Sequence, residues 1–489
     1  MKKILIFGLA CGLMGCVHGR SGAVDTVLQD LPAEHLGAVV YTRDTAKFLT
    51  FLKAEIDAIE KIAGGAMQQQ MQDDLGFHPL TAEGLAAAGL DPTRQMAFWL
   101  GGTNPKKPSV HGVLPLGNRD KFLTALDRIL VKGSLSRGSP VKTAKGDWIG
   151  LNRTTGQRSE PAGGLLINSR WVILTTGERG DLQAFSEGPS VAQHPHLETL
   201  RHRSQKAGQM AVFMTPKWLE QLQGTSLGSE MPQAAALYAD VQMTPGKEVF
   251  VEALSFSLPE ALALQRRLTP KPVARVPSPK GAVLAATGTM NVTELFAFVK
   301  EEDEVAKVLK KEQRMVDAIE PVLAKLGTDF TFSLGVDGEP ANPMILLGSL
   351  FARLDIAGGQ PREALDGVLA AAKVLELPTD KVQAVEGGYD LFIPPFVRVR
   401  FRADDQNLTI AYGRDAQPDS DSALMKIAEG QMNAGLFDGA KVGRMVSKMV
   451  RMNIGPKIGA LLQRYGSWET WSGPLEAITA GYGRLKITP

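Results

Sequence analysis

Six sequence elements occur in the same order on both sides of a proline-rich segment. The segment is LTPKPVARVPSPKG, residues 268–281, and it contains Pro270, Pro272, Pro277 and Pro279. Proline at this density disfavours both helices and central strands, so it predicts a semi-rigid extended linker. The chain of 489 residues is long enough for a domain on each side of it.

Each half predicts a strand, a helix, two further strands, a helix and a β-hairpin. The strands are indicated by alternating apolar residues between short polar turns, and the helices by apolar residues at helical spacing. The matching ranges are 37–42 and 281–288, 48–56 and 295–302, 96–102 and 330–336, 110–116 and 344–356, 120–130 and 362–375, and 163–177 and 395–413. After the hairpin, each half predicts another helix, a strand and a helix.

The repeated order predicts an α+β fold built from two tandem copies of a mainly antiparallel sheet packed by helices. The alternative is two unrelated domains with a similar order of elements. The expected segments are a signal peptide at 1–15, a tether at 16–30, a first lobe at 31–268, the linker at 269–280 and a second lobe at 281–489.

The N-terminus has the layout of a bacterial export signal. Lys2 and Lys3 precede the apolar run Ile4–Met14, which is too short for a spanning helix of about 20 residues. The run ends in Leu13-Met14-Gly15-Cys16, which resembles the lipobox of bacterial lipoproteins. The alternative is an ordinary secretory signal that contains an incidental cysteine.

The lipobox resemblance implies cleavage between Gly15 and Cys16 and acylation of Cys16, including a palmitate-type chain. Each buried CH₂ contributes roughly 0.8 kcal/mol, so two or three chains would form a lasting membrane anchor. Val17 is not the aspartate that retains such proteins in the inner membrane. The resemblance therefore implies an outer-membrane lipoprotein that faces the periplasm or the surface.

Cysteine use and charge exclude several classes of protein. The chain has two cysteines: Cys11 lies within the signal and Cys16 would carry lipid, so no disulfide is expected in the mature fold. Removal of residues 1–15 also removes Lys2 and Lys3, which leaves 54 − 2 = 52 basic against 52 acidic residues. A nucleic-acid partner is not expected, because such proteins carry a basic excess.

The mature chain also resembles an uncharacterised family of exported bacterial proteins with paired α+β units. The resemblance is carried by LPAEHLGAVVY, residues 31–41, and by GFHPLTAEGLAAAGLDPTRQMAF, residues 76–98. These motifs are structural, and the family provides no catalytic residues to transfer.

Three local motifs resemble sites of chemistry. Ser226 lies in GTSLG, which matches the nucleophile-elbow pattern, but the residues before it predict a helix and not a strand. His194, His196 and His202 lack the i,i+4 spacing of a helical metal pair, and His194 is expected to cap a helix. Asp419 and Asp421 lack the glycine and the closing glutamate of a calcium loop, so helix capping is expected.

One helix carries a candidate membrane-facing surface. Between 437 and 452, Val442, Met445, Val446 and Met449 form an apolar side, and the basic stripe consists of Lys441, Arg444, Lys448 and Arg451. Such a helix can lie on anionic headgroups. The alternative is a core-packed helix with a solvated basic side.

These observations predict a non-enzymatic, lipid-anchored envelope protein that needs no cofactor and acts as a binding or scaffolding module for an envelope partner. The alternative is a carrier or sensor of an apolar, lipid-like ligand. A hydrolase with dispersed catalytic residues leaves no local signature and stays a third class.

Overall fold

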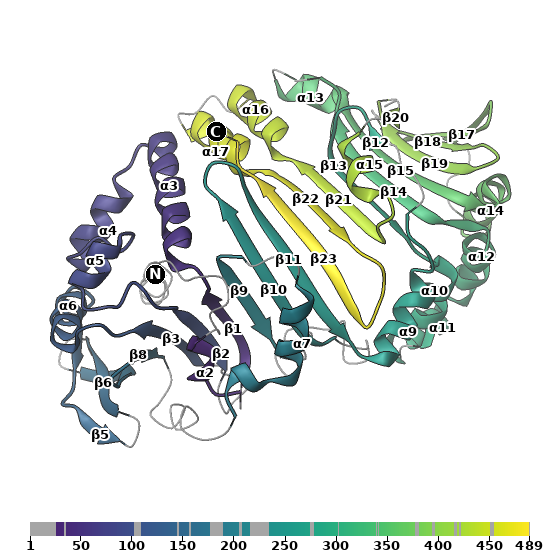
Figure 1. Cartoon of the computed structure of the whole chain (residues 1–489). Coiled ribbons are helices and arrows are strands. Elements are labelled where there is room, and N and C mark those ends of the chain that lie inside the picture. The colour runs from purple at the N-terminus through teal and green to yellow at the C-terminus, as the bar shows by residue number, and fades with distance from the viewer. Residues whose placement is uncertain are drawn as a thin grey trace. The chain divides into compact units, whose positions relative to one another are not determined.

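The chain folds into two compact units, Met1–Leu258 and Pro259–Pro489. The structure is a computed structural model (Figure 1) that describes residues 26–33, 36–101, 109–143, 146–155, 158–176, 189–204, 208–215, 234–273, 278–301, 303–338, 340, 342–376, 381–393, 397–414, 418–419, 422–449 and 454–488. The division between the units precedes the ten-residue helix α9 (Pro259–Leu268), which the domain prediction placed in the first lobe.

The first unit contains one antiparallel sheet. Its strands are β1 (Leu36–Thr42), β2 (Ala97–Gly101), β3 (Ser109–Pro115), β4 (Leu135–Arg137), β5 (Val141–Thr143), β6 (Gly146–Thr155), β7 (Arg158–Ile167), β8 (Trp171–Thr175), β9 (Met210–Met214), β10 (Ala234–Thr244) and β11 (Glu248–Ser257). Neighbouring strands follow the order β11-β10-β9-β1-β2-β3-β8-β7-β6, and β6 also pairs with β4 and β5.

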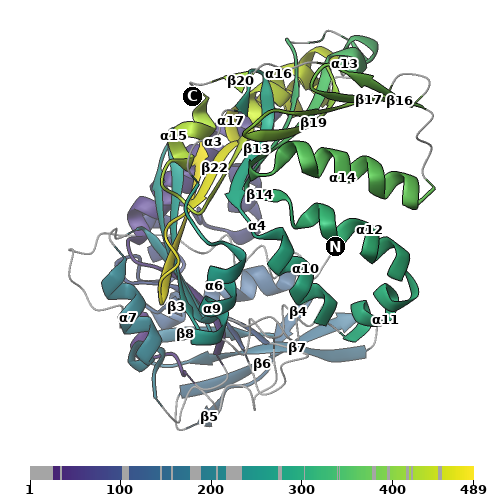
Figure 2. The same cartoon turned by 90° about the vertical axis from the view of Figure 1, so that its right-hand side faces the viewer.

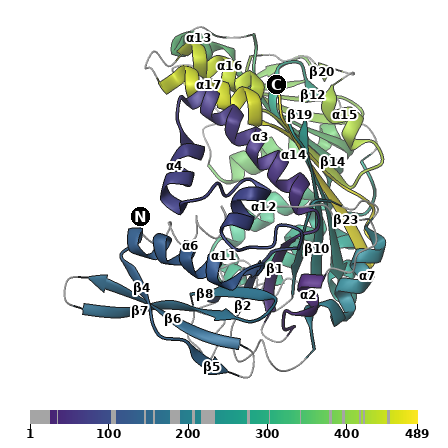
Figure 3. The ribbon, with the colours of Figure 1, turned by 60° about the vertical axis from the view of Figure 1, so that its left-hand side comes forward.

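Helices cover one face of this sheet. They are α3 (Thr45–Ala63), α4 (Met67–Leu75), α5 (Ala82–Ala87) and α6 (Arg119–Lys132); α2 (Thr26–Gln29), a 3-10 turn η2 (Val191–Gln193) and α7 (Pro195–Arg203) complete the unit. Leu49 of α3 and Leu126 of α6 share one buried cluster with Leu114 of β3 and with Met96, which directly precedes β2. Figure 3 shows α3, α4 and α6 on the same side of the strands.

The second unit also contains one main antiparallel sheet. Its strands are β13 (Ala282–Thr289), β14 (Leu326–Val336), β15 (Leu350–Gly359), β16 (Val382–Val385), β17 (Gly388–Ile393), β18 (Val397–Ala403), β19 (Asn407–Gly413), β21 (Asn433–Asp438), β22 (Ser467–Ser472) and β23 (Ile478–Lys486); the short strands β12 (Ser278–Pro279) and β20 (Pro418–Asp419) pair separately. The strand order is β23-β22-β21-β13-β14-β15-β19-β18-β17-β16.

The helices of the second unit are, besides α9, α10 (Val292–Glu301), α11 (Asp303–Lys311), α12 (Gln313–Leu323), α13 (Pro343–Ser349), α14 (Pro361–Val374), α15 (Ala423–Ala428), α16 (Gly439–Met449) and α17 (Ile454–Tyr465). No helix in the described ranges has the length and apolar character needed to cross a bilayer.

The predicted α+β class with mainly antiparallel sheets is confirmed. The two strand orders also correspond position by position, with β1 matching β13, β2 matching β14, and β9 matching β21. Each matched strand pair from the sequence comparison lies at equivalent places in the two sheets. A shared order of strands describes a shared fold, so tandem duplication of one ancestral unit stays a prediction.

Residues 344–349 are helical, although the sequence pattern predicted a strand over 344–356. The side chain of Asn342 accepts a hydrogen bond from the backbone N–H of Ile345 at 2.9 Å, and Pro343 occupies the first helical position. Both residues favour a helix start, and the strand β15 begins only at Leu350.

The sequence of residues 291–326 predicts one long surface helix that begins at Asn291 and bends at Pro321. The structure has three helices there, α10, α11 and α12. Asn291 begins the first of them as expected, because its side chain accepts from the N–H of Glu294 at 3.2 Å. The chain leaves helical geometry at Glu312, whose ψ is 35°. Pro321, where a kink was expected, lies inside α12.

Each unit also contains a hairpin that the sequence pattern did not predict, β10–β11 in the first unit and β22–β23 in the second. A Pro245-Gly246 turn, with Gly246 at φ 63°, joins β10 and β11. Pro-Gly between two alternating runs is a hairpin signal that was available in the sequence. Residues 216–223, where a helix was expected, lie outside the described residues.

Glycines bring α16 and α17 into close contact. A Cβ atom on Gly443 would lie against the carbonyl oxygen of Gly459 and 2.7 Å from the backbone nitrogen of Gln463. A Cβ atom on Gly459 would meet the hydroxyl of Ser447. Only glycine, whose side chain is a single hydrogen atom, therefore allows this spacing between the two helices.

The substitution Gly443→Ala is expected to destabilise the second unit. Alanine favours a helix by about 1 kcal/mol over glycine, but overpacking the α16–α17 contact should outweigh this and leave a net loss of about 1.5 kcal/mol. Urea unfolding measures the change. Gly348→Ala is the control, since a Cβ there meets nothing within 4 Å; a stability loss as large in the control would contradict the packing explanation.

Candidate functional site

One face of the second sheet carries a continuous line of apolar side chains. Directly paired residues on neighbouring antiparallel strands project from the same face. The cross-strand pairs define one residue from each of β22, β21, β13, β14, β15 and β19, here called the apolar row: Trp468, Phe437, Leu284, Leu334, Ala352 and Tyr412. At about 4.8 Å per strand, the five steps of the row span roughly 24 Å.

Four of the five large side chains of the apolar row are exposed, and the fifth, Phe437, is partly buried against the cluster that contains Met445 of α16. The exposed fraction is 51% for Trp468, 41% for Leu334, 39% for Tyr412 and 37% for Leu284. Phe332 lies on the same face two residues before Leu334 and is 40% exposed. Scattered exposed apolar residues are ordinary, but a contiguous set across several strands is typical of a binding surface.

The row lies between two parts of this sheet face that helices cover. Ile356 and Leu408 of this face pack against Ala364 and Leu365 of α14. Nearer the other end of the strands, α16 packs on the same face, with Met445 against Val336. Figure 2 shows α14 and α16 separated along the strands β13 and β14. In the first unit, the matched positions Phe98 and Leu100 are only partly exposed.

The opposite face of this sheet carries charged side chains that are paired with one another, beside an apolar cluster in which Ala285 and Ala434 pack against Leu424 of α15. Asp390, which is fully buried, accepts hydrogen bonds from Arg398 Nε at 2.8 Å and Arg402 Nη2 at 2.7 Å. Burial raises the pKa of Asp390, but the bonds from the two guanidinium groups outweigh it and hold the pKa below its ordinary value. On the same face, Arg353 Nε lies 2.7 Å from Asp355.

A pair of buried carboxylates lies in the first unit. Asp240 of β10 and Glu252 of β11 are direct cross-strand partners, and the hydroxyl of Ser204 lies 2.6 Å from the first and 2.8 Å from the second. Arg43 Nη1 lies 2.8 Å from Asp240. Burial raises the pKa of Asp240, and the bonds from Ser204 and Arg43 partly oppose this. Both carboxylates are almost fully buried, so this cluster has no face for a substrate.

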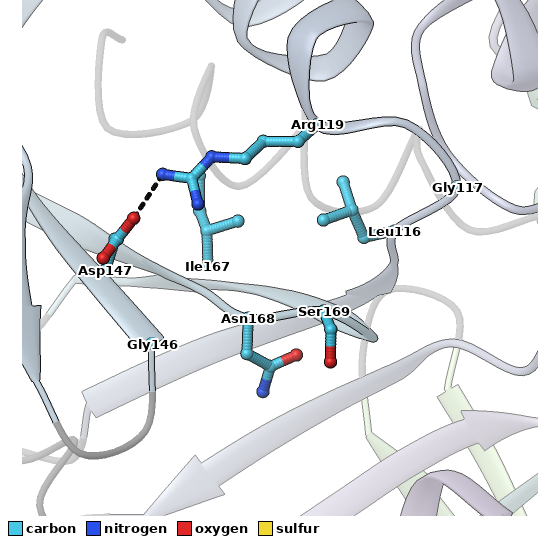
Figure 4. Close-up of a pocket in the computed structure, with 8 residues that line it drawn as sticks. All are labelled: Leu116, Gly117, Arg119, Gly146, Asp147, Ile167, Asn168 and Ser169. Carbon is cyan, nitrogen blue, oxygen red and sulfur yellow. Dashed lines mark hydrogen bonds and ion pairs between the residues drawn. The ribbon is translucent and has the colours of Figure 1, made fainter.

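An open pocket of about 520 Å³ also lies in the first unit (Figure 4). Its charged groups, Arg119 and Asp147, form an ion pair with each other. The side-chain oxygen of Asn168 accepts hydrogen bonds from the N–H groups of Arg170 and Trp171 at 2.8 and 2.7 Å. The pocket therefore presents polar groups that already bind one another, and no base lies beside Ser169 in its lining.

Several residues singled out from the sequence lie outside the described ranges: Gly15, Cys16, Ser226, Asp421 and Arg451. Asp419 lies in β20 and pairs with Ser278. The helix after it is capped by Ser422, whose hydroxyl oxygen faces the N–H of Met425 at 3.4 Å, so the expectation that Asp419 acts as the cap is wrong.

His194 and His196 are packing residues, whereas His202 is exposed. His194 occupies the N-cap position of α7 as expected, but its side chain makes no capping hydrogen bond. Its ring centroid lies 5.0 Å from that of Phe213, and burial, together with the neighbouring His196, lowers its pKa. His202 Nε2 lies 3.9 Å from Glu198, away from this pair. Within the described ranges, no group of three or more His, Cys, Asp or Glu residues is placed to hold a metal ion.

The basic stripe of α16 is not uniform. The apolar side packs on the sheet, with Val442, Met445 and Met449 in one cluster. Lys441 turns inward, and its Nζ donates to the carbonyl oxygens of Gly281 at 3.0 Å and Val336 at 2.6 Å. Arg444 and Lys448 are exposed. Lys441 therefore stabilises the ends of β13 and β14, while the other two described cations lie on the solvated side.

No protein-family model matches this chain, and no curated protein matches it. A solved structure described as crystal form IV of TP0453 is similar at 9% identity and a TM-score of 0.28, over 49% of this chain and 84% of that chain. A likeness this weak supports no functional conclusion, so the function is argued from the residues themselves.

Proposed function

We propose that the protein is a lipid-anchored bacterial envelope protein, held in the outer membrane, that acts as a non-enzymatic binding module. Its second unit binds an apolar ligand of the acyl-chain class along the apolar row. The observation that supports this is the exposure of Trp468, Leu284, Leu334 and Tyr412 side by side on one sheet face. This exposure favours a carrier or sensor of an apolar ligand over a scaffold for a protein partner.

The chemistry of the row suits an extended hydrocarbon chain. Its length of roughly 24 Å, at about 4.8 Å per strand, is that of a long acyl chain lying across the strands. The six side chains of the row contain no charge. Trp468 and Tyr412 lie at its two ends, and their polar N–H and O–H groups suit the boundary between a dry and a wet surface.

The titratable groups near the site support a binding role. The acids on the opposite face are held by arginines, as in the contacts of Asp390 and Asp355. The pKa of Asp390 is lowered, and a carboxylate with a lowered pKa is a poor general base near neutral pH.

Fatty-acid binding tests this function. The chain from residue 16 onward, carrying Cys16→Ser, is titrated with a fluorescent long-chain fatty acid, with octanoate as the short competitor. Saturable binding is expected, and affinity should rise with chain length, because each buried CH₂ adds about 0.8 kcal/mol. Native mass spectrometry of protein taken from the membrane should show a stoichiometric lipid mass.

The double variant Leu284→Gln/Leu334→Gln should lower the affinity for the fatty acid about tenfold or more, since both side chains lose apolar contact with it. Val385→Gln is the matched control, because Val385 is equally exposed but lies on the strand β16. No saturable binding, or equal affinities in the row variant and the control, would overturn the ligand proposal and favour a protein partner.

A further inference from the structure

The short helix α13 exposes three large aliphatic side chains at one end of the second unit. The exposed fraction is 80% for Met344, 68% for Leu347 and 53% for Ile345. None of them belongs to the apolar row. Aliphatic side chains this exposed and this close together in sequence are typical of a surface that meets another phase or partner.

The helix is held firmly in this position. The side chain of Asn342 caps it, and Pro343 occupies its first turn. Its Leu346 points into the unit and shares an apolar cluster with Val442 and Met449 of α16. Met344, Ile345 and Leu347 are therefore presented outward by a helix anchored on the opposite side.

Cations lie on α16, which packs beside this helix through Val442 and Met449. The segment 439–465, which includes α16 and α17, contains six lysines and arginines and no aspartate or glutamate. Arg444 and Lys448, one turn apart on α16, are exposed. Val442 and Met445 face the sheet, and Gly443 and Ser447 face α17, so helical geometry directs Arg444 and Lys448 to a third side of α16. Figures 1 and 3 both show α13, α16 and α17 at the same end of this unit.

We infer that Met344, Ile345, Leu347, Arg444 and Lys448 form a docking surface for a bilayer with anionic headgroups. Aliphatic side chains of a short helix enter the boundary between headgroups and acyl chains, and neighbouring cations bind the headgroup phosphates. Charge complementarity selects this partner, because a segment of this length without one carboxylate is poorly matched to a neutral protein surface. The surface would hold the second unit against the membrane to which Cys16 tethers the chain.

Vesicle sedimentation tests the docking surface. The chain from residue 16 onward, with Cys16→Ser, is mixed with vesicles of phosphatidylcholine alone or with phosphatidylglycerol added. Binding is expected to the anionic vesicles at low salt, with a clear loss at high salt. Absence of binding to the anionic vesicles would overturn the inference.

Two variants address the two components of the surface. Arg444→Glu/Lys448→Glu should lower the partition coefficient about tenfold or more by removing attraction to the headgroups. Met344→Ser/Leu347→Ser leaves the charge unchanged and should lower it by about tenfold through lost apolar insertion. All four side chains are exposed, so the folded state should be retained, which an unchanged unfolding midpoint verifies.

The control is Lys310→Glu/Lys311→Glu, which makes the same charge change on the exposed end of α11. An equal loss of binding in this control would assign the effect to net charge and overturn the docking surface, as would unchanged binding in either test variant. Fatty-acid binding by the apolar row uses other residues, so failure of one proposal is distinguishable from failure of the other.

Discussion

The Cys16→Ser chain is expected to leave the membrane fraction at moderate salt, while the wild-type chain stays. The lipobox resemblance assigns the Cys16 thiol to a diacylglycerol and its amine to a further acyl chain. At roughly 0.8 kcal/mol for each buried CH₂, the loss of two or three chains removes nearly all membrane affinity. The docking surface, which acts through both apolar insertion and charge, should retain only weak binding that high salt lowers.

Intact mass measurement of membrane-extracted protein checks this expectation. The wild-type mass should correspond to a chain that begins at residue 16 and carries acyl chains. Cys11→Ser is the control and should keep both the mass increase and the anchor, because Cys11 lies within the expected signal. An unlipidated mass with a different first residue would make the protein a freely secreted one.

Asp390→Asn is expected to lower the free energy of unfolding of the second unit by about 2–3 kcal/mol at neutral pH. The substitution removes a buried carboxylate between Arg398 and Arg402 and leaves two cations without it. Removing one member of a buried ion pair costs about 3–5 kcal/mol, and partial exposure of the two arginines reduces this.

The effect of Asp390→Asn should depend on pH in a defined direction. The folded pKa of Asp390 lies below its ordinary value of 3.8. The ion pairs therefore stabilise the wild type fully above 3.8, and this stability is lost as the pH falls through the folded pKa. Urea unfolding from neutral to acid pH should show the two proteins converging. Asp405→Asn is the control, because Asp405 and its partner Arg362 are both mostly exposed; a gap that stays constant with pH would contradict the ion-pair explanation.

The strands were predictable where large apolar residues recur at every second position, because alternate residues of a strand face opposite sides of the sheet. MAFWLGG and FTFSLGV alternate in the same way, and they form β2 and β14 at equivalent positions. The run MILLGS does not alternate, and a short apolar run fits a strand and a buried helix equally well. The cap at Asn342 was the signal that could have distinguished them.

The apolar row was not predictable from any local pattern. Leu284, Leu334 and Tyr412 each look like an ordinary inward-facing strand residue. Their adjacency follows from the register of β13, β14, β15 and β19. Their exposure follows from where α14 and α16 pack. The same limit explains why Lys441 was placed on a solvated stripe, since the carbonyl oxygens it binds belong to Gly281, just before β13, and to Val336, at the end of β14.

The sequence by itself determined the α+β class and the position of most strands, because hydrophobic periodicity and turn residues act within a few residues of one another. It also carries the export and lipobox pattern from which the anchor is predicted. Only the tertiary structure decided which apolar side chains are covered. A period-two pattern specifies that a strand has two different faces, but whether a helix lies over a face depends on segments distant in the chain. For this reason the apolar row and the exposed side of α13 became visible only in the folded unit.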